Sequence, residues 1–374
     1  MDTQSFFICI LGIVGACIGS YLNVVIYRIP RGQSSSQPRR SYCPACQVKI
    51  PFYRNVPILT WMIQRGRCHA CQESISFRYV IVEVLTCVLF IALWIHTPDW
   101  RVLISAVFVS LLIAISFIDA EHYIIPVNWC WLGGLLALFA NVFCPTLISD
   151  KGSHLLDYVK RLCHVETVDT SFLLSLMGGC LGFIILQVVV VLGKLVFGTI
   201  RHTSEVAQPW FLKEPEEEFD ELQFVYGETS YGWSDIFYRK SDRIEMESTQ
   251  IKLDGKPIGA GAVTIRERVV TIDAVEYDIT RLQSLEGQTH RVTIPREAMG
   301  GGDPPLLAMI GAFLGPYAVV YTLFSSSVFA LLFAFGARLG FGKPLPYGPF
   351  LAMGAMSWIF GGDRIFQWYL SIVG

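Results

Sequence analysis

The stretch FFICILGIVGACIGSYLNVVIYRIPR, residues 6–31, indicates what kind of protein this chain is. It is apolar from Phe6 to Ile26 and then runs into arginines at positions 28, 31, 39 and 40. No positive charge precedes it, which distinguishes it from a cleaved secretory leader. An apolar run of about 20 residues that ends in basic residues is typical of a helix that crosses a membrane.

The composition of the whole chain points the same way. Of its 374 residues, 53% are hydrophobic and only 16% are charged, whereas about a quarter of the residues of a soluble domain are charged. We therefore predict an all-α polytopic membrane bundle of eight transmembrane helices. The expected spans are residues 5–27, 79–97, 101–118, 124–145, 170–198, 304–320, 321–341 and 348–372. The net charge of −2 gives no support for a nucleic-acid partner, and we expect none.

The loop 28–78 sets the orientation of the bundle. It holds nine Arg or Lys residues and a single acid, Glu73, so the positive-inside rule places it in the cytoplasm. Successive connections between spans then alternate between the cytoplasmic side and the outer side. The cytoplasmic connections are 119–123, 199–303 and 342–347, and the outer ones are 97–100 and 146–169, together with both termini.

These features divide the chain into five parts. Residues 1–27 form the first span, 28–78 a cytoplasmic zinc-binding loop, 79–198 spans two to five, 199–299 an inserted domain, and 300–374 the last three spans. The insert alternates apolar and polar residues as strands do, and Asp254-Gly255 between two such runs is a hairpin signal. We expect a small β-rich cytoplasmic domain.

Two cysteine pairs in the first loop predict a metal site. Cys43-Pro-Ala-Cys46 and Cys68-His-Ala-Cys71 are separated by 21 residues. Two such knuckles at this separation suit a tetrahedral zinc ion bound by four thiolates. Two disulfides are the alternative, which the reducing cytoplasm disfavours. A zinc ion held by four thiolates would be structural and would help to fold the loop.

Two aspartates are candidates for chemistry. Asp119 ends the third span, and Asp303 follows three glycines and precedes Pro304 and Pro305. Each has a simpler explanation, because Asp119 could cap the membrane boundary and Asp303 could be a helix N-cap. The orientation nevertheless puts both at the same membrane face. Of two adjacent carboxyl groups one holds a proton and the other is ionised, which suits a general acid and a general base.

Several stretches, in this order, resemble the type IV prepilin peptidases, which are membrane aspartyl proteases with a GxGD motif. The matching stretches are GACIGSYLNVVIYRIPRG (15–32), CPAC (43–46), RGRCHAC (65–71), the run ISFRYVIVE that ends at Glu83 (75–83), FIDAEHYIIP (117–126), GGGD (300–303) with LLAMIGAFLG (306–315), and PYGPFLAMGA (346–355). The resemblance implies that Asp119 and Asp303 are the catalytic pair. It also implies that Cys43, Cys46, Cys68 and Cys71 bind zinc.

The resemblance implies a substrate and a location as well. Its members cut the basic leader from prepilins or pseudopilins at the cytoplasmic face of the bacterial inner membrane, in contact with lipid. Many also N-methylate the new N-terminus with S-adenosylmethionine, so that cofactor is expected if the second activity is present. The pathway served would be a type IV pilus or type II secretion.

The chain departs from that family at two places. Pro305 stands where the family has a lysine, and the insert 199–299 is not a general feature. Pro305 supports an alternative reading, a catalytically altered scaffold or assembly protein. A transporter is a third, since acids within the membrane often mark ion paths. The insert holds 19 acids and 12 bases, so it either docks on the basic zinc loop or is a tethered domain that binds an unrelated partner.

Overall fold

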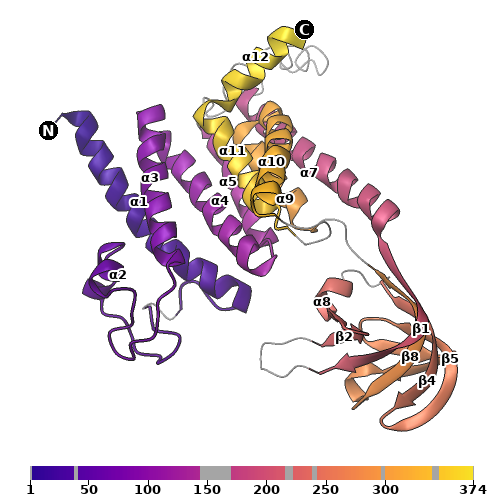
Figure 1. The fold of residues 1–374 in the computed structure, drawn as a ribbon. Coiled ribbons are helices and arrows are strands. Elements are labelled where there is room, and N and C mark those ends of the chain that lie inside the picture. Colours follow the sequence, from indigo (N-terminus) through magenta and orange to yellow (C-terminus); the bar gives the residue numbers. More distant parts are fainter. Residues whose placement is uncertain are drawn as a thin grey trace. The chain divides into compact units, whose positions relative to one another are not determined.

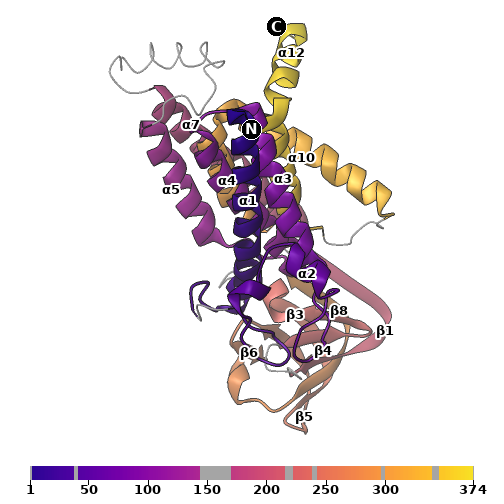
Figure 2. The same cartoon turned by 90° about the vertical axis from the view of Figure 1, so that its left-hand side faces the viewer.

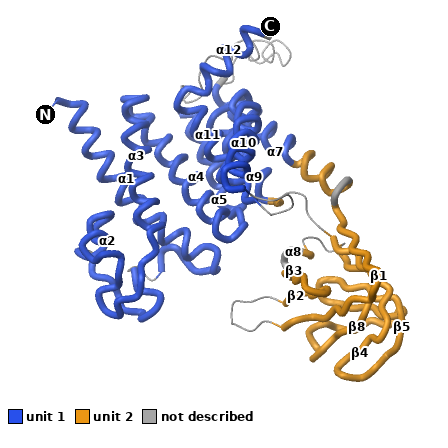
Figure 3. The backbone as a smooth tube through the Cα atoms, in the orientation of Figure 1, with its two compact units in different colours: residues 1–186, 302–374 blue, residues 187–301 orange. Residues whose placement is uncertain are grey.

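The computed structural model describes residues 2–37, 41–143, 170–214, 222–237, 242–295, 300–338 and 345–373. They form two compact units, the first made of residues 1–186 and 302–374 and the second of residues 187–301 (Figure 3). The expected outer segment 146–169 lies outside the described residues. Each unit is described separately below.

The first unit is a bundle of helices (Figure 1). Its main helices are α1 (Thr3–Arg28), α3 (Arg78–His96), α4 (Val102–His122), α5 (Val127–Phe143), α7 (Thr170–Phe197), α9 (Asp303–Leu314), α10 (Pro316–Gly336), α11 (Gly348–Ser357) and α12 (Asp363–Val373). The short α2 (Leu59–Ile63) lies in the loop between α1 and α3. Helix α7 begins in this unit and continues into the second.

Five described segments are long and apolar enough to cross a membrane: Thr3–Arg31, Arg78–His96, Val102–His122, Ser171–Leu195 and Pro316–Gly336. Two further apolar helices, α5 and α9, are shorter. A multi-helix membrane bundle is therefore confirmed, whereas eight full spans are not. The large apolar side chains that remain exposed on these helices, such as Leu195 and Phe335, suit contact with lipid.

The sixth, seventh and last expected spans have the wrong boundaries. The sixth was expected to reach residue 320, but α9 ends at Leu314, because Gly315 takes a φ of +86° and Pro316 begins a new helix. The last, 348–372, is divided by a π-helical segment, Trp358–Gly362, in which Phe360 and Gly361 leave helical geometry. Hydropathy is continuous across both breaks, so it did not reveal them.

Helix packing at the N-terminal side depends on glycine. A Cβ added to Gly15 would lie 2.9 Å from the Cα of Cys87, and one added to Gly19 would lie 2.7 Å from the Cα of Glu83. Helices α1 and α3 therefore touch backbone to backbone, the close approach that small residues permit in membranes. Helix α4 packs on both (Figure 2). It also packs on α11, while α9 packs on α5, α10 and α11.

The second unit contains one antiparallel sheet, as the alternating sequence predicted. Its strands are β1 (Thr199–Lys213), β2 (Gln223–Tyr226), β3 (Thr229–Gly232), β4 (Ile244–Leu253), β5 (Lys256–Ile265), β6 (Val269–Ile272), β7 (Val275–Asp278) and β8 (Leu285–Pro295), with a short helix α8 (Trp233–Ile236). Their order is β3-β2-β1-β8-β4-β5-β6-β7. Asp254 and Gly255 both have positive φ in the β4–β5 turn, which confirms the hairpin.

That sheet has a hydrophobic core of its own. Trp210, Phe224 and Ile244 are fully buried in it, and the Trp210 indole N–H donates to Ser248 Oγ at 2.7 Å. Fourteen buried apolar side chains make up the cluster, so the insert carries the packing expected of an independent domain.

Candidate functional site

Asp119 lies in the last turn of α4 and is only 5% exposed. Its Oδ2 accepts the backbone N–H of Gly348, the first residue of α11, at 2.9 Å. A Cβ at position 348 would lie 2.7 Å from that oxygen. Glycine at this position therefore lets the backbone of α11 begin directly against the carboxyl group.

Asp303 is the first residue of α9 and is 4% exposed. The expectation that it is the N-cap is wrong, because Gly302 holds that position. Pro304 and Pro305 follow within the first turn, where proline fits a helix, and both are buried. The Oδ1 of Asp303 is buried and finds no hydrogen-bond partner among the described residues. A buried polar atom without a hydrogen bond lowers the stability of the fold by about 1–3 kcal/mol. Its presence therefore indicates that Asp303 is retained for a reason other than stability.

The structure brings these two carboxyl groups together from distant parts of the sequence. They are close enough to interact electrostatically. Ile125, in the turn after α4, packs so closely on Gly302 that a Cβ there would lie 2.5 Å from the isoleucine Cβ. Gly302, the last of the three glycines, thus allows this close contact with Ile125. Two buried carboxyl groups that interact resist being ionised together, so one can act as an acid while the other acts as a base.

The four loop cysteines also converge. Their sulfur atoms all lie within 4.8 Å of one another, and Cys43 Sγ is 3.8 Å from Cys71 Sγ. A tetrahedral zinc ion with bonds of about 2.3 Å places its sulfur ligands about 3.8 Å apart. All four are free thiols, so the alternative of two disulfides is not found here. The residues therefore fit a metal ion of this kind.

Each cysteine pair is held by the same backbone turn. The N–H of Cys43 donates to Val48 O at 3.1 Å, and the N–H of Cys68 donates to Glu73 O at 2.8 Å. Gln47 and Gln72 take matching positive φ angles of 57° and 61°.

One member of the second pair, Cys68, also favours a thiolate. Backbone N–H groups of Cys71 and Ala70 lower the pKa of the Cys68 thiol to about 7. The ionised form is the one that binds a metal, so the backbone of the knuckle prepares this ligand for metal binding.

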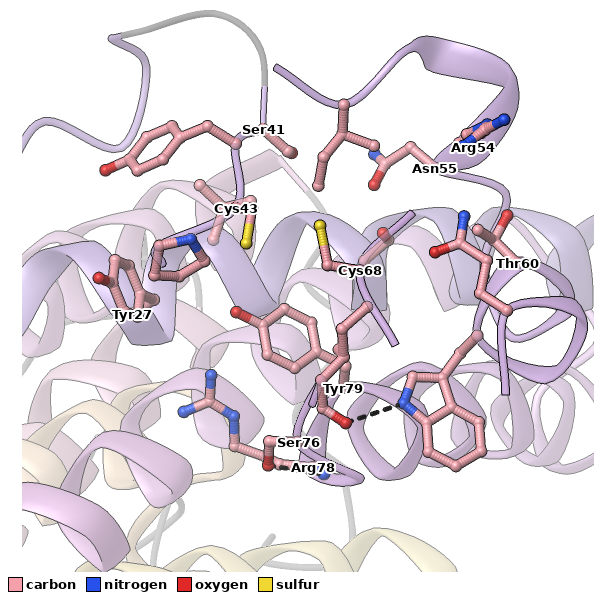
Figure 4. Close-up of a pocket in the computed structure, with 18 of the residues that line it drawn as sticks. Tyr27, Ser41, Cys43, Arg54, Asn55, Thr60, Cys68, Ser76, Arg78 and Tyr79 are labelled. Atoms are coloured by element: carbon pink, nitrogen blue, oxygen red, sulfur yellow. Dashed lines mark hydrogen bonds between the residues drawn. The ribbon is translucent and has the colours of Figure 1, made fainter. Parts of the chain in front are cut away.

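A cavity of about 490 Å³ opens beside the cysteines (Figure 4). The end of α1, the start of α3 and the cysteine loop form its walls. Figure 4 shows Tyr27, Tyr79 and Arg78 around it, with Cys43 and Cys68 at its edge. Its volume lies in the range of small-molecule sites.

Two acidic side chains of the cavity connect it to the bundle. Glu83, in the second turn of α3, is 6% exposed, and its Oε2 accepts the N–H of Ile58 at 2.7 Å. Glu121 forms an ion pair with Arg78 and lies two residues after Asp119 on α4. The cavity and the aspartate pair therefore share the end of α4.

Sequence reasoning assigned no role to Gly348 or Glu83. Gly348 contacts a residue 229 positions away, which no local pattern predicts. A signal for Glu83 was present, because it is the only acid in the expected span 79–97 and acids within membrane helices usually have a function.

Comparison with protein families gives two matches. Residues 13–97 match the bacterial peptidase A24 N-terminal domain, and residues 280–335 match the type IV leader peptidase family. The first match includes the four cysteines, and the second includes Asp303. No solved structure matches the chain.

Comparison with curated proteins gives relatives named prepilin leader peptidase/N-methyltransferase. One from Myxococcus xanthus is 42% identical over 37% of this chain and 41% of its own length. One from Dichelobacter nodosus is 25% identical over 94% of this chain and 91% of its own length. One from Neisseria gonorrhoeae is 33% identical over 34% of this chain and 54% of its own length. The chain thus spans about half the length of the first and third and nearly all of the second.

Proposed function

This chain belongs to the type IV leader peptidase family, and from that membership we propose that it is a membrane aspartyl endopeptidase that removes the basic leader from type IV prepilins or pseudopilins. The observation that supports this most is the pair of buried carboxyl groups at the end of α4 and the start of α9. The names of its relatives include prepilin leader peptidase.

The proposed chemistry uses the two aspartates alone. One carboxylate takes a proton from a water molecule, which attacks the scissile carbonyl carbon, while the other, protonated, gives its proton to the carbonyl oxygen. The tetrahedral intermediate then collapses, the C–N bond breaks, and the leaving amine takes a proton from the pair. The Gly348 N–H keeps Asp119 oriented throughout.

The proposed location follows from the charges of the first loop. Its excess of arginine supports a cytoplasmic position for the zinc loop, and for a multi-pass protein with bacterial relatives we propose the inner membrane. A basic leader would remain in the cytoplasm while its apolar helix enters the bilayer. The scissile bond would then lie at the membrane boundary, within reach of Asp119 at the end of α4 and Asp303 at the start of α9.

A second activity, N-methylation of the new N-terminus, is favoured by the cavity beside the cysteines. The relatives' names include it, and a volume of about 490 Å³ accommodates a nucleoside-sized ligand. S-adenosylmethionine supplies a methyl group on positively charged sulfur; transfer to the amine breaks that C–S bond as the C–N bond forms and a proton leaves the nitrogen. We propose that zinc, held by Cys43, Cys46, Cys68 and Cys71, stabilises the part of the cavity wall that the cysteine loop forms.

Cleavage of a prepilin by the purified protein tests the proposal. Asp119→Asn and Asp303→Asn should each lower the rate by about a hundred- to ten-thousand-fold, the usual contribution of acid–base catalysis. The matched control is Asp99→Asn, which alters an aspartate that pairs with Arg101 before α4. Wild-type rates in either dyad variant would contradict the assignment, and a wild-type protein that cannot cleave would favour the scaffold alternative.

A further inference from the structure

Glu83 is a buried acid on a helix that is otherwise apolar. It lies five residues into α3, a candidate membrane span, and it lines the cavity. Burial of a carboxylate at such a depth is costly and usually marks a binding or catalytic role. The hydrogen bond from Ile58 N–H and the contact with the Ser20 side chain offset that cost only in part, because neither supplies a positive charge.

Of the basic residues in the cavity walls, Arg54 lies over the ring of Tyr53, 5.9 Å from its centre, and two others have polar partners. Arg78 pairs with Glu121, and Arg28 donates to the carbonyl oxygens of Ser34 and Ser35 at 3.3 and 3.4 Å. Within the described part of the chain, no basic side chain forms an ion pair with Glu83. The cavity therefore offers a carboxylate that suits a cation from outside.

The position of Glu83 limits which cation can reach it. Glu83 lines the cavity from the candidate membrane span α3, together with Ser20 and Val24 of α1, whereas other lining residues belong to the cysteine loop. A ligand from the aqueous side meets the loop first. A ligand whose body is an apolar helix in the bilayer, with its charged end at the boundary, meets Glu83 first.

Cleavage by the proposed function produces such a ligand. Once the leader is removed, the remaining substrate is an apolar helix that begins with a positively charged ammonium group. The cavity lies close to the site of its formation, because Glu121 in the cavity wall is two residues from Asp119.

We propose that this cavity holds the new N-terminal ammonium of the cleaved substrate and that Glu83 is the carboxylate that binds it. This inference rests on the proposed cleavage activity. The aromatic walls formed by Tyr27, Trp61 and Tyr79 exclude water and so strengthen the ion pair. Glu83 thereby fixes the nitrogen at one side of the cavity and leaves the cysteine-loop side for a methyl donor.

Binding of two synthetic peptides to the full-length protein in detergent tests this assignment. Both carry the first residues of a mature pilin helix and a fluorophore at the C-terminus; one has a free N-terminal amine and the other is N-acetylated. Fluorescence polarisation, without any methyl donor, should show that the wild type binds the free amine about ten- to a hundred-fold more tightly, as expected for a charge-assisted hydrogen bond. Glu83→Gln should remove that preference.

Glu73→Gln is the matched control, since Glu73 also lines the cavity but is exposed, and it should retain the preference. Thermal unfolding shows whether each variant is folded. The comparison of the two peptides on the wild-type protein does not depend on any variant. Equal binding of both peptides to the wild type would overturn the proposal, as would a preference that persists in folded Glu83→Gln. Because the peptides are already mature, failure here is distinct from failure of cleavage, which full-length prepilin reports.

Discussion

At the scale of single residues, the contact between Gly348 and Asp119 is the most sensitive point of the candidate site. Gly348→Ala would place a Cβ 2.7 Å from the carboxylate oxygen and 3.3 Å from its carbon. The side chain of Asp119 must then move, and a displacement of about 1 Å can reduce a rate about a hundred-fold. We expect prepilin cleavage to fall by about ten- to a hundred-fold, measured as kcat in detergent.

The control for that substitution is Gly134→Ala on α5, where a Cβ would meet nothing within 4 Å. It should leave the rate unchanged. Full activity in Gly348→Ala would mean that the carboxylate does not need this backbone position.

The residues of the candidate site were predictable from sequence to different degrees. The aspartates and cysteines stood out because carboxylates at membrane boundaries and paired CxxC knuckles are rare without a function. The partner of Asp119 was not predictable, because only the tertiary fold brings position 348 to position 119. Asp303 was mistaken for an N-cap because the proline signal locates a helix start only to within a residue.

At the scale of elements, the cysteine loop should depend on its metal. It has few buried apolar side chains of its own besides Cys43 and Cys68, so zinc would supply much of its folding free energy. Cys68→Ser should reduce the bound zinc from about one per chain to a small fraction. Mass spectrometry of the metal content would measure this, and faster proteolysis between residues 41 and 75 should accompany the loss.

The matched control is Cys9→Ser, which removes an exposed free thiol outside the cluster and should change neither quantity. A purified wild-type protein with no metal and with the four thiols joined as disulfides would contradict the assignment of zinc.

Element boundaries show where sequence reasoning reaches its limit. The hairpin at Asp254-Gly255 was located correctly because its turn residues need positive φ. The break at Gly315 was missed since it interrupts a run without charged residues that continues from 304 to 337. Helix α12 was taken as the end of a span, although its polar residues Arg364, Gln367 and Ser371 lie on one side and suit a helix at the membrane surface.

At the scale of the whole molecule, the opposite charges of the insert and the first loop remain a basis for prediction. The stretch 199–299 holds 19 acids and 12 bases, and the stretch 28–78 holds nine bases and one acid. If they dock, cysteines introduced singly into each, with the four cluster thiols retained and the others removed, should cross-link at low salt. About 1 M salt should reduce the yield, because it shortens the range of charge interactions to about 3 Å.

Deletion of 205–290 with a flexible replacement completes that experiment. If docking holds the site open, the shortened protein should cleave more slowly than the full chain. No cross-link at several pairs, combined with full activity of the shortened protein, would show that the insert serves another partner.

The early end of α9 has a consequence for the surrounding lipid. Its 12 residues extend about 18 Å, whereas the hydrocarbon core of a bilayer is about 30 Å thick. Residues 303–313 of α9 are buried, but α5, the exposed apolar helix that packs on it, is also short at 17 residues. This hydrophobic mismatch favours a bilayer that thins beside the pair, which would bring interfacial water closer to a substrate bond at the depth of Asp303. Proteoliposomes of short-chain lipids should therefore support faster cleavage than those of long-chain lipids at equal protein content. If the cleavage rate does not depend on acyl-chain length, the water must reach the site by a route within the protein.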